Sequence, residues 1–298
     1  IIFEPKHPIK FLGFTIQGMF LKRQKEVSRV YSDIIESKEE LLKYYSAISE
    51  LFNESFGKPL DKELWEWAYL NNPFGAPKVA IATHQGIVIG HYAVIPMNIE
   101  NKDKELLGFL SMTTMVAIDF RKLRLFQRLA EMVYERIQCL GLPSIVFGFP
   151  NDNSAPGFKK RLGWTISEDY KVVSVEPQQI PDVVSVIDKL LDENCFTLNM
   201  DKESTENWRT SKPSQTWSYD NNIGTKEIGQ EFDLMHISDA KQLELLNSNK
   251  SINMILPIDK ESILSDIHVS FPYRFGYKIF NCEAEPRLFV QMSMSDIF

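Results

Sequence analysis

The residues of this chain whose types and spacing could do chemistry begin with a basic turn, Arg121-Lys-Leu-Arg124. The apolar segment 108–118 before the turn predicts a strand, and the segment 126–140 after it predicts a helix. A helix that begins at such a turn offers unpaired backbone N–H groups and the positive end of its dipole to an anion. The sequence therefore predicts an anion site at this junction. The alternative is that the basic residues form a solvated turn.

A second junction of the same kind follows at Asn151. Residues 144–149 form a continuous apolar run, typical of a central strand, and Ser154 with Pro156 predicts the first turn of another helix. The two strand-to-helix junctions could form two walls of one cleft. Asn151 cannot accept a proton, but its amide can orient a water molecule or an amine.

His91 is the candidate proton acceptor, because it lies on a predicted strand near that cleft and its unperturbed pKa suits general-base catalysis near neutral pH. The alternative is a half-buried strand residue with no catalytic role. Asp119 is expected to begin the basic turn.

The composition indicates a globular protein of two domains, with 298 residues, 44% of them hydrophobic and 24% charged. A net charge of -7 argues against nucleic acid as a partner. Cys139, Cys195 and Cys282 are far apart, which predicts no disulfide framework and favours a reducing cytoplasm. The five histidines show no metal-ligand spacing, and the apolar run 9–21 is too short to span a membrane. We expect residues 1–30 to be an N-terminal extension, vector-derived in part before Met19.

Other elements position these residues. Ser37 with Glu40 predicts a capped helix through Phe52, and Asp61 predicts the start of a second helix that ends before Pro73. Trp65, Trp67, Tyr69 and Phe74 could stack on a base or a sugar, or belong to the core. Further predictions are strands at 78–82, 86–95, 216–219, 232–237, 252–256 and 288–294, helices at 203–210 and 240–246, a break at 178–181 and a link at 192–201.

The order and spacing of several local matches over roughly residues 37–170 resemble the GNAT superfamily of N-acyltransferases. The matches are Trp65-Glu-Trp-Ala-Tyr-Leu-Asn-Asn-Pro73, Gly90-His-Tyr92 with Pro96, Asp119-Phe-Arg121, Phe149-Pro-Asn151 with Ser154, and Leu162-Gly-Trp164. They are similar to a bacterial branch found in surface-polysaccharide loci. Asn207-Trp-Arg209 and the ending at 292–298 resemble the second, degenerate GNAT-like half of sugar N-acyltransferases in that branch.

The resemblance implies an α/β GNAT fold, which is a mixed twisted sheet flanked by helices, with a second, degenerate GNAT-like C-terminal domain. The acyl-coenzyme A binding domain would span residues 31–180 and the second α/β domain residues 181–298. A backbone N–H on the strand at 113–118 would stabilise the oxyanion of the reaction.

The resemblance also implies that acyl-coenzyme A is the co-substrate and binds by its pyrophosphate at the basic turn. The family's turn usually reads Arg/Gln-x-x-Gly-x-Gly/Ala, so Arg124 and Phe126 occupy the two small positions. Arg124 either pairs with phosphate oxygens in place of close backbone approach or impairs the cradle. The implied cofactor-binding residues are Val116, Ala117, Ile118, Arg121, Lys122, Leu123, Arg124, Leu125, Phe126, Asn151, Ser154 and Phe158.

The family's tyrosine that protonates the leaving thiolate aligns with Lys159. A cation at this position could stabilise the developing thiolate. Alternatively, water protonates the thiolate and Lys159 is an exposed helix residue. His91, Asn151 and Lys159 are thus the catalytic residues that we predict.

The resemblance implies a cytoplasmic N-acyltransferase that acts by direct attack in a ternary complex on the amine of a nucleotide-linked (dTDP or UDP) amino sugar, in surface-polysaccharide biosynthesis such as that of lipopolysaccharide, O-antigen or capsule. The alternatives are a peptide or protein amine as the acceptor, or a non-catalytic acyl-coenzyme A binding module. We expect no metal, no nucleic acid or membrane partner, and a homodimer as the candidate assembly.

Overall fold

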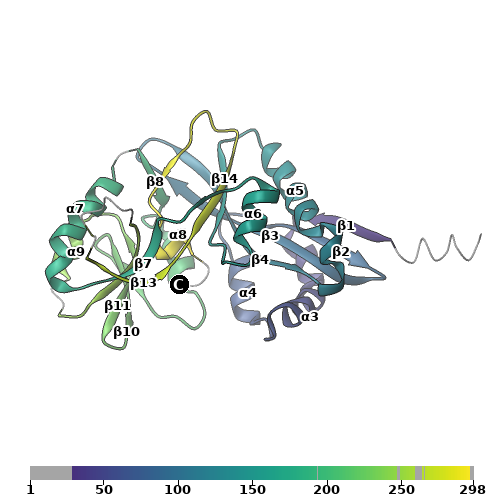
Figure 1. Cartoon of the computed structure of the whole chain (residues 1–298), viewed down its shortest axis with the longest axis horizontal. Coiled ribbons are helices and arrows are strands. Elements are labelled where there is room, and N and C mark those ends of the chain that lie inside the picture. Colours follow the sequence, from purple (N-terminus) through teal and green to yellow (C-terminus); the bar gives the residue numbers. More distant parts are fainter. Residues whose placement is uncertain (1–28, 193, 247–248, 259–263, 265, 296–298) are drawn as a thin grey trace, which may run out of the picture.

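The structure is a computed structural model that describes residues 29–192, 194–246, 249–258, 264 and 266–295. Residues 1–28 of the expected N-terminal extension and the last three residues of the motif at 292–298 lie outside this part of the chain. The molecule has two lobes, each built around one sheet (Figure 1).

The sheet of the first lobe is mixed, because the pairing of β4 with β5 is parallel while the other neighbours along its main path are antiparallel. Its strand order is β1 (Val30–Ile35), β2 (Lys78–His84), β3 (Ile87–Glu100), β4 (Glu105–Val116), β5 (Ser144–Gly148), β14 (Phe275–Phe280) and β6 (Thr165–Ser167). At one end of β3 the sheet continues through β8 (Cys195–Leu198), which also pairs with β15 (Arg287–Leu288).

The sheet of the second lobe is also mixed. Its strand order is β9 (Ser218–Asp220), β10 (Ile223–Ile228), β11 (Glu231–Ile237), β12 (Ile252–Pro257), β7 (Tyr170–Val175) and β13 (His268–Pro272). Again one step, β11 to β12, is parallel and the others are antiparallel. The two lobes exchange strands: β14 lies beyond residue 181 yet completes the first sheet, while β7 lies before residue 181 yet completes the second.

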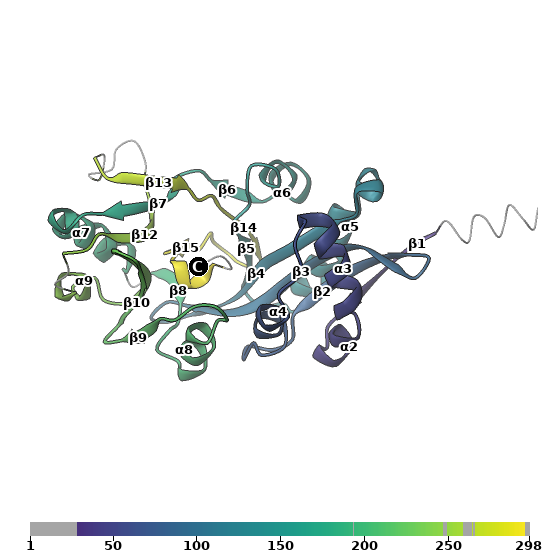
Figure 2. The same ribbon diagram turned by 90° about the horizontal axis from the view of Figure 1, so that it is seen from below.

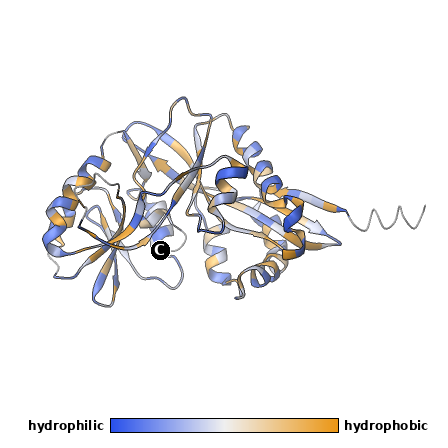
Figure 3. Ribbon diagram, viewed as in Figure 1, coloured by the Kyte–Doolittle hydropathy of each residue, from blue (hydrophilic) through white to orange (hydrophobic). Residues whose placement is uncertain are grey.

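Helices cover both faces of the first sheet. In Figures 1 and 2, α3 (Tyr45–Phe56) and α4 (Lys62–Tyr69) lie on one face, whereas α5 (Leu125–Gln138) and α6 (Ala155–Leu162) lie on the other. Figure 3 shows that α5 and α7 (Ile180–Leu190) each carry both hydrophobic and hydrophilic residues, as expected of helices that pack one side against a sheet. No helix of the described residues is long and apolar enough to cross a membrane.

The local signals for helix starts are confirmed. The Ser37 hydroxyl accepts a hydrogen bond from the Glu40 backbone N–H (3.1 Å), and the Asp61 carboxylate accepts one from the Leu64 N–H (3.1 Å). The helix predicted after Ser37 is divided at Tyr44 into α2 (Lys38–Lys43) and α3.

Three predictions for the later part of the chain were wrong. The break at 178–181 is the start of α7, because Pro181 stands in the first turn, where its missing N–H costs no hydrogen bond. The link at 192–201 contains β8, which finds its partner in the distant β3. The strand at 288–294 is the two-residue β15 followed by the 3₁₀ turn Met292–Met294.

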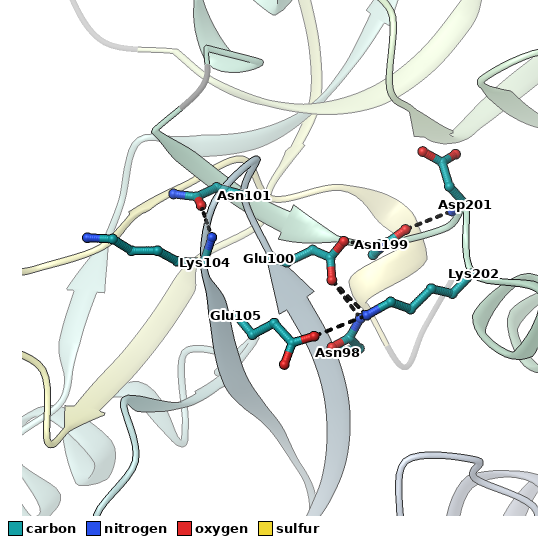
Figure 4. A network of polar contacts seen from close by, with 8 residues as sticks. All are labelled: Asn98, Glu100, Asn101, Lys104, Glu105, Asn199, Asp201 and Lys202. Atoms are coloured by element: carbon teal, nitrogen blue, oxygen red, sulfur yellow. Dashed lines mark hydrogen bonds and ion pairs between the residues drawn. The ribbon is translucent and has the colours of Figure 1, made fainter.

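A polar network joins β8 and α8 (Glu203–Thr210) to the β3–β4 hairpin (Figure 4). The Lys202 ammonium donates to the carboxylates of Glu100 (2.8 Å) and Glu105 (3.3 Å), and hydrogen bonding to Glu100 raises the pKa of Lys202. The Asn199 amide also donates to Glu100. These contacts join the two lobes at the end of the first sheet. We call this boundary between the lobes the seam.

Two tryptophans close the other part of the seam. The Trp67 indole of α4 donates to the backbone carbonyl of Trp208 in α8 (2.6 Å), and the Trp208 indole donates in return to the carbonyl of Trp67 (3.0 Å). Their rings stack at 4.9 Å. Trp67, like Trp65 and Tyr69, is therefore core rather than a platform for a ligand, with 5% of its surface exposed.

Candidate active site

A cleft opens where β4 and β5 separate. The two strands pair in parallel from Leu107 and Ser144 to Leu110 and Phe147. Beyond these pairs the strands border a cavity of about 790 Å³, which adjoins a second cavity of about 570 Å³ at the start of α5 and α6. We call the two together the cleft. It is lined by Ser55, Phe56, Ser111, Met112, Thr113, Thr114, Met115, Val116, Arg121, Phe126, Gly148, Phe149, Pro150, Asn151, Asn153, Ser154, Pro156, Gly157, Phe158, Lys160, Arg161 and Trp164.

A β-bulge shapes the β4 wall of the cleft. The register of β3 and β4 shifts between His91 and Ala93, and Thr113 has a left-handed backbone conformation (φ 50°). A bulge interrupts the ladder and leaves backbone groups of the extra residue unpaired. The Tyr69 and Thr113 hydroxyls are hydrogen bonded, so α4 holds the bulge from its face of the sheet. The bulge thus brings backbone that the ladder does not use to the edge of the cleft.

His91 lies behind this bulge and does not line the cleft. Its Nδ1 is 2.8 Å from the carbonyl oxygen of Thr113, and its Nε2 has no hydrogen-bond partner among the described residues. Burial lowers the pKa of His91 to about 4, although the bond to Thr113 opposes the shift. The imidazole is therefore neutral at pH 7 and donates to Thr113, which makes it a support of the bulge. The predicted role as proton acceptor does not fit a side chain that is buried and does not line the cleft.

The basic turn folds as the 3₁₀ segment Ile118–Leu123 followed by Arg124, the N-cap of α5. Arg124 adopts the left-handed conformation (φ 57°) that favours glycine, so the turn forms with an arginine in this place. The Arg121 guanidinium donates to the carbonyl of Val116 (3.2 Å) and lines the cleft. Because α5 starts here, backbone N–H groups of its first turn have no partner within the helix.

The residues predicted to bind the cofactor fall into two groups. The cleft brings together Val116, Arg121, Phe126, Asn151, Ser154 and Phe158. It does not include the side chains of Ala117 and Leu125, which are buried, or those of Ile118, Lys122, Leu123 and Arg124, which are exposed. The residues of the second group can contact a ligand in the cleft only through their main chain. Lys122 and Arg124 are exceptions, because their side chains are long.

Asn151 organises the turn before α6. Its side-chain oxygen accepts hydrogen bonds from the backbone N–H groups of Asn153 (3.1 Å) and Ser154 (3.0 Å) and from the Ser154 hydroxyl (3.1 Å). Ser154 is the N-cap residue of α6, but its hydroxyl donates to Asn151 instead of accepting from a backbone N–H of the helix. The Asn151 amide group is left to face the cleft, where it can orient a ligand.

The orientation of α6 separates two adjacent lysines. Phe158, Lys160 and Arg161 line the cleft, whereas Lys159 is exposed and does not. The structure therefore does not place Lys159 in the wall of the cleft. Among the described residues that line the cleft, Arg121, Lys160 and Arg161 carry positive charge and none is acidic. The cleft suits an anionic ligand.

Several lining residues were not predicted from the sequence, among them Ser55, Phe56, Ser111, Lys160 and Arg161. The sequence does contain a signal for Ser111, Thr113 and Thr114, because these three hydroxyl residues stand within an otherwise apolar predicted strand. Within the described part of the chain, no group of three or more His, Cys, Asp or Glu residues is placed to hold a metal ion.

Residues 39–167 match the family described as "Acetyltransferase (GNAT) domain". No curated protein matches the chain in sequence. This segment is therefore similar to GNAT domains, and the prediction of a GNAT-type N-acyltransferase is confirmed. Enzymes of this family use acyl-coenzyme A as co-substrate.

Solved structures share the fold at low sequence identity. A GCN5-related N-acetyltransferase from Kribbella flavida has a TM-score of 0.55 at 10% identity and covers 85% of this chain and 72% of its own. A probable N-acyltransferase of unknown function from Enterococcus faecalis V583 has a TM-score of 0.54 at 9% identity, covering 84% and 73%. A GCN5-related N-acetyltransferase from Anabaena variabilis has 0.53 at 11%, covering 84% and 72%. The predicted α/β GNAT fold is confirmed.

Proposed function

We propose that this enzyme transfers an acyl group from acyl-coenzyme A to the amine of a nucleotide-linked amino sugar, by direct attack in a ternary complex in the cytoplasm. The observation that carries the proposal is the composition of the cleft wall. It offers hydroxyls, amides and aromatic faces, from residues such as Ser111, Thr113, Asn153 and Trp164, and no described lining residue is acidic. A protonated amine on a polyamine or a lysine would find no carboxylate here, whereas a sugar is recognised by hydroxyls, amides and aromatic rings.

The donor's phosphates belong at the basic end of the cleft. Arg121, Lys160 and Arg161 border the cavity at the start of α5 and α6, where the first-turn N–H groups of α5 also lie. Charge and unpaired N–H groups together bind pyrophosphate. The pantetheine arm then runs along β4 toward the bulge, and the thioester reacts in the larger cavity.

The chemistry needs few protein groups. The neutral amine attacks the thioester carbon, the C–S bond breaks, and coenzyme A leaves as a thiolate. A backbone N–H at the bulge stabilises the oxyanion of the intermediate. A thiol with a pKa of about 8.5 leaves without a strong acid, and the amine proton passes to water, because the described lining holds no carboxylate, histidine or tyrosine.

The test is release of free thiol from acetyl-coenzyme A with three acceptors in parallel: a dTDP- or UDP-linked amino sugar, a lysine peptide and spermidine. We expect turnover with the nucleotide sugar and none above background with the other two. Turnover confined to the peptide or to spermidine would refute the sugar proposal and leave the donor site intact.

Two adjacent lysines provide a matched pair for the donor site. Lys160→Ala should weaken acetyl-coenzyme A binding about threefold to tenfold, as expected for loss of one partly exposed charge contact. Lys159→Ala should bind like the unaltered protein, because Lys159 does not line the cleft. Calorimetry measures both. Equal affinities for the two variants would mean that the phosphates bind elsewhere.

A further inference from the structure

The larger cavity of the cleft ends where β4 and β5 stop pairing, and an indole closes this end. The last pair is Leu110 with Phe147, so Ser111 and Gly148 are the next residues on the two strands. Both line the cavity, as does Trp164, which follows α6. A Cβ atom added at Gly148 would lie 3.2 Å from the Ser111 carbonyl oxygen, 3.7 Å from the Ser111 Cβ and 3.6 Å from the Trp164 Cη2. Because a single added atom would already touch both residues, a carbon chain cannot pass between the indole and the strands at this point.

The Trp164 side chain is held in place from several sides. Gly163 ends α6 in the left-handed conformation (φ 68°), and the Trp164 backbone N–H donates to the carbonyl of Phe158 (3.1 Å). The indole Nε1 donates to the buried Tyr134 hydroxyl (2.7 Å), and the ring packs against that of Phe158, with 4.4 Å between the ring centroids. Only 3% of the surface of Trp164 is exposed, so close packing leaves the indole little freedom to move.

Two glycines let the indole lie directly on the sheet. Gly148 of β5 and Gly276 of β14 are register partners in neighbouring strands. A Cβ atom added at Gly276 would lie 3.0 Å from the Trp164 Cε3. A side chain at position 276 would therefore displace the ring, and one at position 148 would fill the space in front of it. The position of the indole, and with it the depth of the cavity, depends on these two glycines.

This end of the cavity is uncharged and lies away from the cations of the cleft. Within the described part of the chain, the residues that line the larger cavity but not the smaller one carry no charge, whereas Lys160 and Arg161 line only the smaller one. Acyl-coenzyme A carries its phosphates at one end and its acyl group at the other. A donor with its phosphates beside Lys160 and Arg161 therefore brings its acyl group toward the end that Trp164 closes.

We propose that Trp164 forms the end of the acyl pocket and restricts the donor to the shortest acyl groups, acetyl above all. This inference rests on the proposed binding of acyl-coenzyme A. The methyl group of an acetyl donor contacts the indole while the thioester lies at the bulge. Each further methylene must displace the indole or draw the thioester away from the bulge, and a close-fitting pocket rejects such a group by about tenfold or more. Trp164 touches the substrate, whereas Gly276 and Tyr134 position the indole.

The test compares the dissociation constants of acetyl- and butyryl-coenzyme A, measured by calorimetry on the full chain without an acceptor. In the unaltered protein we expect butyryl-coenzyme A to bind about tenfold or more weakly than acetyl-coenzyme A. Trp164→Phe opens the end of the pocket. The ratio of the two constants should then shift about tenfold in favour of butyryl, because each of its two additional methylenes is worth about fourfold in affinity when buried. Trp65→Phe is the matched control, since Trp65 is buried but does not line the cleft, and it should keep the original ratio.

Ser111→Thr changes the same end of the pocket in the opposite direction. It adds one methyl group on β4 and keeps the hydroxyl, which donates to the Tyr92 hydroxyl (3.2 Å). We expect it to weaken butyryl-coenzyme A about threefold or more relative to acetyl-coenzyme A. An unchanged ratio in Trp164→Phe, or in Ser111→Thr should Trp164→Phe not fold, would overturn this inference alone, as would equal affinities of the unaltered protein for the two donors. Failure of the unaltered protein to bind any acyl-coenzyme A would overturn the proposed function together with it.

Discussion

Acid should destabilise this protein through its buried histidines, and His91 is the residue with which to test this. Its side chain is 1% exposed, and burial lowers its pKa to about 4, against a value of about 6.5 in an unfolded chain. Between these two pH values the unfolded state binds a proton that the folded state does not. The stabilising difference is therefore fully present above pH 6.5 and is lost as the pH falls toward 4.

The magnitude follows from the two pKa values. At pH 4.5 nearly every unfolded molecule carries the proton on His91, whereas only a minority of folded molecules do. At about 1.4 kcal/mol for each pH unit, the loss between pH 7.5 and pH 4.5 is about 2–3 kcal/mol from this one side chain. His91→Asn removes the titrating group and can still donate an amide proton to the Thr113 carbonyl.

The assay is urea-induced unfolding at pH 7.5 and pH 4.5. The fall in the free energy of unfolding between the two pH values should be about 2–3 kcal/mol smaller in His91→Asn than in the unaltered protein. Any change in the free energy of unfolding that the substitution causes equally at both pH values cancels in this difference. His268→Asn is the control, because His268 lies exposed on β13. If His91→Asn loses as much stability with acid as the unaltered protein does, the buried neutral state of His91 is refuted.

Three further outcomes can be measured by urea unfolding at neutral pH. Arg124→Gly should raise the free energy of unfolding by up to about 1 kcal/mol, because Arg124 has a left-handed backbone (φ 57°), and a decrease would show that its side chain makes contacts that matter more. Gly108→Ala should lower it by about 1–3 kcal/mol, because the new Cβ would lie 2.6 Å from Ile99 Cδ1 and 3.0 Å from the Met97 carbonyl; unchanged stability would contradict the close packing of β3 on β4. Trp208→Ala should lower it by about 3–5 kcal/mol, because it removes a buried ring stacked on Trp67, and a loss below 1 kcal/mol would mean that this seam contributes little.

The sequence predicted the elements whose signals are local. Caps such as Ser37 and Asp61 act within three residues, so they fixed the starts of helices in the first lobe. The apolar run of β5 and the amphipathic α5 were equally readable, and with the basic turn between β4 and α5 they located the cleft. Side chains of Arg121 and Asn151 reached the cleft because their places at strand-to-helix junctions determine it.

The features that could not be predicted were strands that pair over a long distance in the sequence and side chains that differ by a small rotation around a helix axis. No local signal indicated β14, which pairs with β5 more than 120 residues earlier in the chain, or β8, which pairs with β3. Lys159 and Lys160 differ by one helical position, about 100° around the axis, and the resemblance alone could not show that Lys160 is the one that lines the cleft. The burial of His91 was not predicted, because alternation along a strand does not show which face a helix covers.

The exchange of strands gives the second lobe a part in the chemistry of the first. β14 is supplied by the second half of the chain, yet it lies beside β5, the strand that forms one wall of the cleft. Its Gly276 leaves room for the Trp164 indole, since an added Cβ would lie 3.0 Å from that ring, and its Lys278 donates to the carbonyl of Leu162 (2.8 Å). Trp164 in turn lines the cleft and donates a hydrogen bond to the Tyr134 hydroxyl (2.7 Å). The second half of the chain is therefore required for the cleft of the first lobe, because it supplies the strand that packs against a tryptophan of the cleft wall.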